Sequence, residues 1–239
     1  GVAVFFFISG YIVPASTMKP TPKPLLRFAL SRVLRLYPAY FISLVVALCI
    51  SSPGIRNWLM NLTMLQRFFG FEDGLGVYWT LQIEILFYFL IAIAIWKGKI
   101  NSPKASMQTT LFFLSLSLCL AAGRYILDRK FPLAPAIGLS IIGAGNFWYW
   151  FHHRAAFTLR QAQLFYGVFF LGLFMSCWLG YNKNWGYGET PSYFIATYSL
   201  AFLIFLSFSL KKWGQWKPLI FLGTISYSIY LFHQPIMTA

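Results

Sequence analysis

The sequence predicts an all-α, polytopic transmembrane helical bundle, and three observations lead to this fold class. Apolar residues make up 59% of the 239 residues and charged residues 10%, which leaves too few charges to cover a water-soluble surface of this size. The mean hydropathy is +0.65. Long apolar runs recur along the chain, and in lipid such runs favour helices, because a helix satisfies its own backbone hydrogen bonds.

About eight apolar segments are expected to span the membrane. They lie at residues 1–13, 36–51, 79–96, 108–122, 132–151, 164–180, 192–210 and 219–239. The first is shorter than the roughly 20 residues that a full span needs, and the segment at 108–122 is also short. The sequence begins without Met and both ends lie inside apolar runs, so we expect truncation at the N-terminus and at the C-terminus. With no repeat or separate soluble region, residues 1–239 are expected to form one membrane-embedded domain.

The positive charge is distributed unequally between alternate loops. In a soluble protein a net charge of +14 would suggest nucleic acid, but here the basic residues lie between apolar runs, so no nucleic-acid partner is expected. Loops 14–35, 97–107, 152–163 and 211–218 hold 13 of the 19 Lys and Arg residues and no acid. The positive-inside rule therefore places these loops in the cytoplasm and the loops at 52–78, 123–131 and 181–191 outside.

Two ionisable residues in apolar segments are candidate functional residues. Glu84 is the only acid within a predicted span, and an acid at such a position is a functional hypothesis by default. The alternative is an interfacial Glu paired to a basic neighbour. His233 is either functional or an interfacial His bonded to a tyrosine such as Tyr230. At about 1.5 Å per residue, both lie roughly 20 Å from the inner face, in the outer half of the membrane.

Arg32 and Arg35 lie three residues apart and share one helical face. At the cytoplasmic edge they would form a phosphate-binding surface, although the pair alone favours membrane anchoring or lipid headgroup contact, because such clusters are common. The three cysteines are far apart in the sequence, so no metal site is expected.

Four motifs occur in a fixed order over nearly the whole chain. They are the opening GVAVFFFISGYIV, the RxxR of Arg32 and Arg35 followed by Pro38, Trp79-Thr80-Leu81-Gln82-Ile83-Glu84 with Phe87 and Tyr88, and Ser226-Tyr227 with Tyr230, His233 and Pro235. In this order the chain resembles the acyltransferase-3 family of integral membrane O-acyltransferases. It departs from the family pattern at Ala3 and Ile85, where acids are common. The helix that carries the family's presumed catalytic His would precede residue 1.

The resemblance implies a function. An acyl group, most simply acetyl, would move from acyl-CoA (acetyl-CoA as co-substrate, with no bound cofactor) to a hydroxyl of a carbohydrate or glycolipid acceptor. Glu84 and His233 would have supporting or acceptor-side catalytic roles. Substrate-binding roles would fall to four residues, with the arginines on the donor's phosphates: Arg32, Arg35, Trp79 and Tyr230. The expected location, among membrane lipids, is a bacterial cytoplasmic (inner) membrane.

Two other classes of function fit the composition. A transporter or flippase of a lipid-linked sugar would also need several spans with buried polar groups, but such proteins often contain inverted repeats, which this sequence lacks. A catalytically inactive structural subunit is the third possibility. Because general-base catalysis most often uses His, and neither His152 nor His153 matches a family motif, we expect residues 1–239 alone to be inactive.

Overall fold

A computed structural model describes residues 1–18, 21–50, 54–184, 188, 190–210 and 217–238. Within these ranges the secondary structure is helical and contains no strand. The elements are α1 (Val2–Thr17), α2 (Pro24–Ile50), α3 (Ile55–Asn61), the 3-10 helix η1 (Gln66–Phe69), α4 (Tyr78–Trp96), α5 (Pro103–Leu127), α6 (Leu133–Arg154), α7 (Leu159–Gly180), α8 (Pro191–Leu210) and α9 (Lys217–Thr238). The predicted all-α class is confirmed.

Within the described residues the eight apolar segments fall almost entirely in α-helices, but the expectation of about eight spans is too high. Among the described residues, five helices are long and apolar enough to cross a membrane, namely α2, α4, α5, α7 and α8. The short segment at 108–122 is part of one of them, α5. Helix α1 is apolar but short. Helices α6 and α9 are long enough but not apolar enough, because their glycine, tyrosine and polar residues lower the mean hydropathy.

The helices cluster into two compact units. The first unit comprises Gly1–Pro20 and Lys97–Leu210, and it holds α1 and α5 to α8. Helices α1 and α6 cross closely in it, because glycine stands at the crossing on both helices. A Cβ on Gly10 would lie 1.7 Å from the carbonyl oxygen of Ile142, and a Cβ on Gly145 would lie 2.1 Å from that of Phe7. Small residues allow this approach, as they do in many membrane helix pairs.

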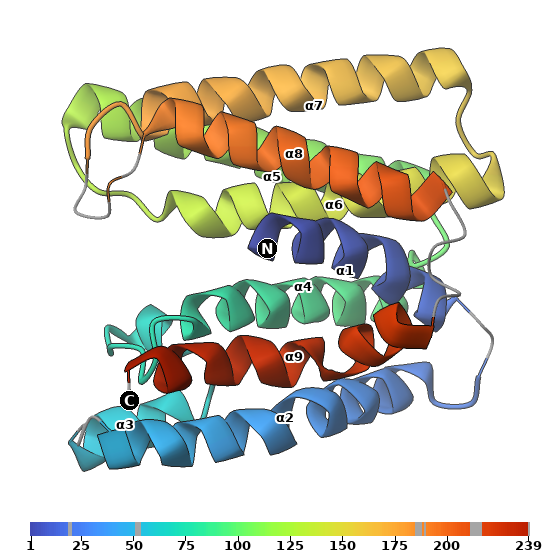
Figure 1. The fold of residues 1–239 in the computed structure, drawn as a ribbon. Coiled ribbons are helices and arrows are strands. Elements are labelled where there is room, and N and C mark those ends of the chain that lie inside the picture. Colours follow the sequence, from blue (N-terminus) through green and yellow to red (C-terminus); the bar gives the residue numbers. More distant parts are fainter. Residues whose placement is uncertain (19–20, 51–53, 185–187, 189, 211–216, 239) are drawn as a thin grey trace. The chain divides into compact units, whose positions relative to one another are not determined.

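The second unit comprises Thr21–Trp96 and Lys211–Ala239. In it α2 packs against both α4 and α9 (Figure 1), and α3 and η1 lie in the connection between α2 and α4. Buried tyrosines join α2 to the start of α4: the rings of Tyr40 and Tyr78 lie 4.8 Å apart, and the Tyr78 hydroxyl is 2.9 Å from Ser43 Oγ. Tyr40 also donates to the Asn61 carbonyl at 2.7 Å, which ties α3 to the same place. The prediction of a single domain over both units stays a prediction.

Helices extend into most of the predicted loops, including the parts that hold Arg32, Arg35 and Arg124. Helix α2 begins at Pro24, a residue type well suited to a first helical turn, so Arg32 and Arg35 lie inside this helix and not in a loop ending at residue 35. Arg124 likewise belongs to α5, where it is buried and donates to the carbonyls of Phe131 and Gly180. Among the residues behind the orientation prediction, Lys19, Glu189, Lys211 and Lys212 lie outside the described residues.

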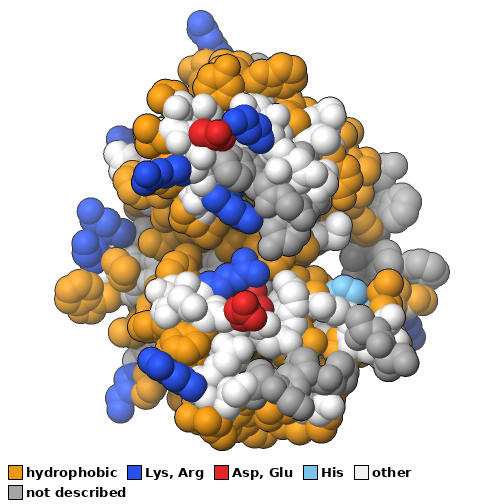
Figure 2. Space-filling model, turned by 90° about the vertical axis from the view of Figure 1, so that its left-hand side faces the viewer, with side chains coloured by type: hydrophobic (Ala, Val, Ile, Leu, Met, Phe, Trp, Pro, Cys, Tyr) orange, Lys and Arg blue, Asp and Glu red, His pale blue; other side chains and the backbone are white. Residues whose placement is uncertain are grey.

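The surface of the described residues is rich in large hydrophobic side chains. Leu34, Leu164 and Leu171 are each about two thirds exposed or more, at 71%, 70% and 67%. Figure 2 shows this hydrophobic surface from one end, with acidic side chains beside basic ones. The ion pairs within 4.0 Å among the described residues are Arg67–Asp73 in the second unit and Lys183–Asp128 in the first. This combination of apolar flanks and several apolar helices long enough to span is that of an integral membrane protein.

Candidate active site

A buried carboxylate and a tyrosine form the centre of the site on α4. Glu84 is 4% exposed and Tyr88, one helical turn later, is 6% exposed. The Tyr88 hydroxyl donates a hydrogen bond to Oε1 of Glu84. The other oxygen, Oε2, is buried and has no hydrogen-bond partner in the described structure. Since a buried carboxylate oxygen normally accepts a hydrogen bond, Oε2 is an open acceptor inside the unit.

Arg32 of α2 lies against Tyr88 of α4. Its guanidinium carbon is 5.5 Å from the centre of the Tyr88 ring and 5.5 Å from that of Phe28. The Nε and Nη1 atoms of Arg32 are buried and have no hydrogen-bond partner among the described residues. The positive charges of Arg32 and of the exposed Arg35 both act on the Glu84 carboxylate. Open donors on α2 therefore lie near an open acceptor on α4.

The sequence predicts that the arginines lie at the cytoplasmic edge and Glu84 in the outer half of the membrane, and these depths stay predictions. Arg32 lies near Glu84 because α2 begins at Pro24, about two turns before Arg32, and because Tyr88, which Arg32 contacts, lies one turn from Glu84 along α4. Arg32 and Glu84 thus belong to one candidate site. No ion pair within 4.0 Å joins them in the described structure, and Tyr88 contacts both.

Helix α9 contributes Tyr230 and His233 at the start of α4. The Tyr230 hydroxyl is 2.7 Å from Thr80 Oγ1 and donates to the Val77 carbonyl at 3.1 Å. His233 is exposed, and its Nδ1 lies 2.6 Å from the carbonyl oxygen of Tyr230. Because a carbonyl only accepts, Nδ1 carries the hydrogen in this contact. Trp79 is half-buried on the same first turn of α4.

The structure thus joins some predicted residues and separates others. Arg32, Arg35 and Glu84 come together, and Tyr230 is close enough for the charge of Glu84 to act on it. His233 belongs to the turn of α9 that meets residues 77–80, one turn from Glu84 along α4, and is not in contact with Glu84 in the described hydrogen bonds. Tyr88 and Tyr227 are motif residues to which the sequence assigned no role. Tyr227 donates to the Leu36 carbonyl at 3.2 Å, which binds α9 to α2.

A polar cluster before α4 was missed by the sequence reasoning. Asp73 accepts from Gln66 at 2.6 Å and from Gln82 at 3.0 Å, and its other oxygen is 2.5 Å from Nε of Arg67. The Asp73 side chain is 3% exposed. Burial raises the pKa of Asp73, and Arg67 and the amide hydrogen bonds oppose that rise. The sequence feature that could have indicated this cluster is an acid just ahead of a predicted span. The buried partners of Asp73 could not be predicted, because they depend on the fold.

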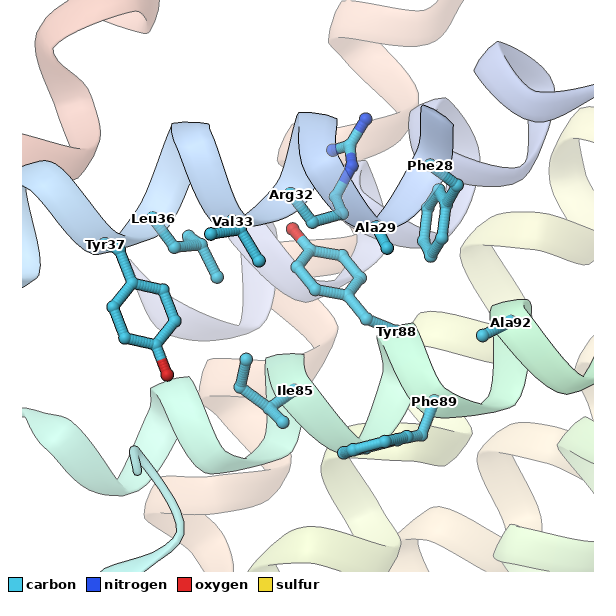
Figure 3. Close-up of a pocket in the computed structure, with 10 residues that line it drawn as sticks. All are labelled: Phe28, Ala29, Arg32, Val33, Leu36, Tyr37, Ile85, Tyr88, Phe89 and Ala92. Carbon is cyan, nitrogen blue, oxygen red and sulfur yellow. The ribbon is translucent and has the colours of Figure 1, made fainter. Parts of the chain in front are cut away.

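A cavity of about 260 Å³ lies between α2 and α4 in the same unit. Its walls are almost entirely apolar, although Arg32, Tyr37 and Tyr88 are among the lining residues, and Figure 3 shows the Tyr88 ring extending from α4 towards α2. No group of three or more His, Cys, Asp or Glu side chains with the arrangement of a metal site occurs among the described residues.

Comparison with known proteins agrees with this architecture. A family model described as an acyltransferase domain matches residues 1–239. The chain is 25% identical to nodulation protein 10 of Rhizobium leguminosarum bv. viciae, an alignment that covers 99% of this chain and 71% of the relative. It is 24% identical to a putative membrane-bound transacylase, BcsY, of Komagataeibacter xylinus, covering 98% of this chain and 65% of the relative. No solved structure matches.

The family match extends over the whole sequence, and the helices long enough to span a membrane include the two that carry Arg32 and Glu84. One relative is itself a membrane-bound transacylase by name. The chain belongs to the acyltransferase-3 family, and it is an integral membrane transferase.

Proposed function

We propose that the protein is an O-acyltransferase that moves an acyl group, acetyl in the simplest case, from acyl-CoA to a hydroxyl of a carbohydrate or glycolipid acceptor. The observation that carries this proposal is the joint placement of Arg32, Tyr88 and Glu84. Open, buried hydrogen-bond donors on α2 lie near an open, buried acceptor on α4. Acyl transfer to an alcohol requires both, since a proton leaves the hydroxyl while negative charge develops on the carbonyl oxygen.

The donor side of the site is the arginine pair. Arg35 is exposed and suits the anionic phosphates of CoA, which reach the protein from water. Arg32 is enclosed by two aromatic rings, and its unpaired Nε and Nη1 suit a carbonyl oxygen that becomes negative during reaction. We therefore assign Arg35 to the phosphates and Arg32 to the donor's thioester end.

The acceptor side combines α4 and α9. Trp79 and Tyr230 offer flat aromatic surfaces on the turns that meet there, and Glu84 and His233 offer acceptors for a hydroxyl hydrogen. In the reaction the acceptor oxygen bonds to the thioester carbonyl carbon, and the C–S bond breaks. The hydroxyl proton passes to a base and then to the departing CoA thiolate, so that CoA leaves as the thiol. Glu84 and His233 support this transfer by orienting the hydroxyl and accepting its hydrogen bond.

Both relatives support the proposal and its location. One is named a transacylase and the other a nodulation protein, and both come from bacteria. The acyl-CoA donor, the carbohydrate class of acceptor and the bacterial inner membrane remain parts of the proposal, as does the activity of the whole protein.

The test is acyl transfer in native membranes with radiolabelled acetyl-CoA, for the wild-type protein and for Glu84→Gln and His233→Ala. We expect the wild-type protein to transfer label to a carbohydrate product. In both variants this transfer should fall at least about tenfold at equal protein level. Glu72→Gln is the matched control, since Glu72 is an exposed acid of the same unit. Wild-type membranes that transfer no label, or that move an unmodified lipid-linked sugar instead, would refute the proposal in favour of a transporter.

A further inference from the structure

Tyr227 connects α9 to the turn of α2 that follows the arginine pair. Its hydroxyl donates to the Leu36 carbonyl at 3.2 Å, and Leu36 comes directly after Arg35 in the sequence. Leu36 is 2% exposed, so this contact lies in the interior of the second unit. Because the phenolic hydrogen is used on a backbone carbonyl, it is not free to bond a substrate. Tyr227 therefore acts on the backbone of α2 and not on a reacting group.

The turn of α2 that contains Arg35 has an interrupted backbone hydrogen-bond ladder. Pro38 lies inside this helix. A proline has no N–H to donate to the carbonyl four residues earlier, here that of Leu34, and its ring crowds the same carbonyl. Helices deform most easily at such positions. Since Arg35 stands between Leu34 and Leu36, its position depends on contacts from outside α2.

Arg35 also has little side-chain packing to hold it. Its side chain is exposed, and none of the ion pairs within 4.0 Å among the described residues includes it. Arg32, one turn earlier, is instead enclosed by two aromatic rings. The side chain of Arg32 is thus fixed by packing, whereas that of Arg35 follows its backbone. The charges of Arg35 and Glu84 both act on the Tyr227 hydroxyl, so this hydroxyl lies close to both sides of the candidate site.

We infer that Tyr227 is a positioning residue for the donor site. By holding the Leu36 carbonyl it keeps Arg35 where the phosphates of acyl-CoA reach it, and it does so without touching the donor. The inference rests on the proposed function, in which Arg35 binds those phosphates. The alternative is a tyrosine that only stabilises the packing of α9 on α2. Such a tyrosine would affect the amount of folded protein but not the affinity of the folded protein for the donor.

The experiment is a double-mutant cycle with Tyr227→Phe and Arg35→Ala, alone and together. Saturation curves with labelled acetyl-CoA in native membranes give the donor concentration for half-maximal transfer. Tyr227→Phe should raise this concentration about 3- to 10-fold, the effect of losing one hydrogen bond between uncharged groups, and should change the maximal rate per protein little. In the Arg35→Ala background the same substitution should have less than about a twofold effect, because it acts through the arginine that is already missing.

Two further measurements accompany the cycle. Tyr193→Phe removes the hydroxyl of an exposed tyrosine of α8 and should leave the half-saturating concentration unchanged. If Tyr227→Phe accumulates poorly, CoA alone is titrated into the purified protein in detergent. The rise in melting temperature then reports the affinity of the protein that does fold, and Tyr227→Phe should need more CoA than the wild-type protein for the same rise.

An unchanged donor dependence in Tyr227→Phe would overturn the inference and leave the proposed function intact. Effects of Tyr227→Phe and Arg35→Ala that multiply in the double variant would do the same, because the two residues would then act independently. If Arg35→Ala alone leaves the donor dependence unchanged, Arg35 does not bind the phosphates, and the inference falls while acyl transfer stands. Absence of transfer from acetyl-CoA in the wild-type protein would overturn both.

Discussion

Tyr88 donates its phenolic hydrogen to the carboxylate of Glu84, four residues earlier on α4, and presents the face of the same ring to the guanidinium of Arg32. One side chain thus contacts a carboxyl group on its own helix and a guanidinium group on another helix. Residues four apart lie on one face of a helix, so α4 alone brings the acid and the tyrosine together, and the packing of α2 supplies the arginine.

Removing only the Tyr88 hydroxyl separates the hydrogen bond to Glu84 from the ring contact with Arg32. In Tyr88→Phe the ring still packs against Arg32, but Glu84 loses its hydrogen-bond donor. We expect acyl transfer to fall about 10- to 100-fold, because a hydrogen bond to a charged group contributes about 1.5–3 kcal/mol. Transfer is measured in membranes at matched protein level. Tyr125→Phe, at an exposed tyrosine of α5, is the control. Full activity in Tyr88→Phe would remove this hydrogen bond from the mechanism.

The two arginines should respond differently to lysine. Arg32→Lys loses a planar, stacked guanidinium with several donors, whereas Arg35→Lys keeps a positive charge at an exposed position. We expect the acyl-CoA concentration for half-maximal transfer to rise in both, and the maximal rate to fall only for Arg32→Lys. Saturation curves for the donor measure both quantities, with the exposed Arg129→Lys as control. If donor dependence is unchanged in both variants, the pair serves only to anchor the helix.

Asp73 should make the stability of the connection before α4 depend on pH. Its pKa is raised by burial above the ordinary value of about 3.9. A carboxyl whose folded-state pKa is raised contributes stability that is present below its unfolded pKa and is lost as the pH rises through the folded pKa. The melting temperature of the wild-type protein minus that of Asp73→Asn should therefore decrease as the pH rises from about 4.

The melting temperatures are measured in detergent as the pH is raised from this value, with Glu72→Gln, at the neighbouring exposed acid, as the control. A melting-temperature difference that increases with pH would contradict the raised pKa of Asp73. In that case the ion pair with Arg67 would outweigh burial, and the pKa of Asp73 would be lowered.

The glycine crossing in the first unit predicts a large effect from one methyl group. In Gly10→Ala the new Cβ would overlap the Ile142 carbonyl, so α1 and α6 must move apart. We expect a loss of about 1–3 kcal/mol in stability, seen as a lower melting temperature in detergent. Gly167→Ala in α7 is the control, since nothing lies within 4 Å of its Cβ, and it should be neutral or slightly stabilising. Equal melting temperatures for the two variants would contradict this close crossing.

The charge asymmetry predicts the orientation of the loops. In a variant lacking Cys49, Cys119 and Cys177, a single cysteine at Glu72 should react with a membrane-impermeant thiol reagent in intact cells, and one at Asn101 should not. Both should react after the membrane is permeabilised, which controls for access. Labelling of the Asn101 position alone in intact cells would reverse the orientation.

The sequence by itself determined the membrane environment and the helical class, and it supplied the candidate site residues. A composition with 10% charged residues leaves helices in lipid as the stable arrangement, and an acid such as Glu84 is conspicuous in an apolar run. The tertiary structure alone decided that Tyr88 contacts both Glu84 and Arg32, that Asp73 is buried among amides, and that a pocket lies between α2 and α4. Hydropathy marks where a segment enters the membrane, but a helix such as α2 can start well before that point. The depth of Arg32, and the space between two helices, depend on how side chains from distant parts of the chain pack together, which no local pattern encodes.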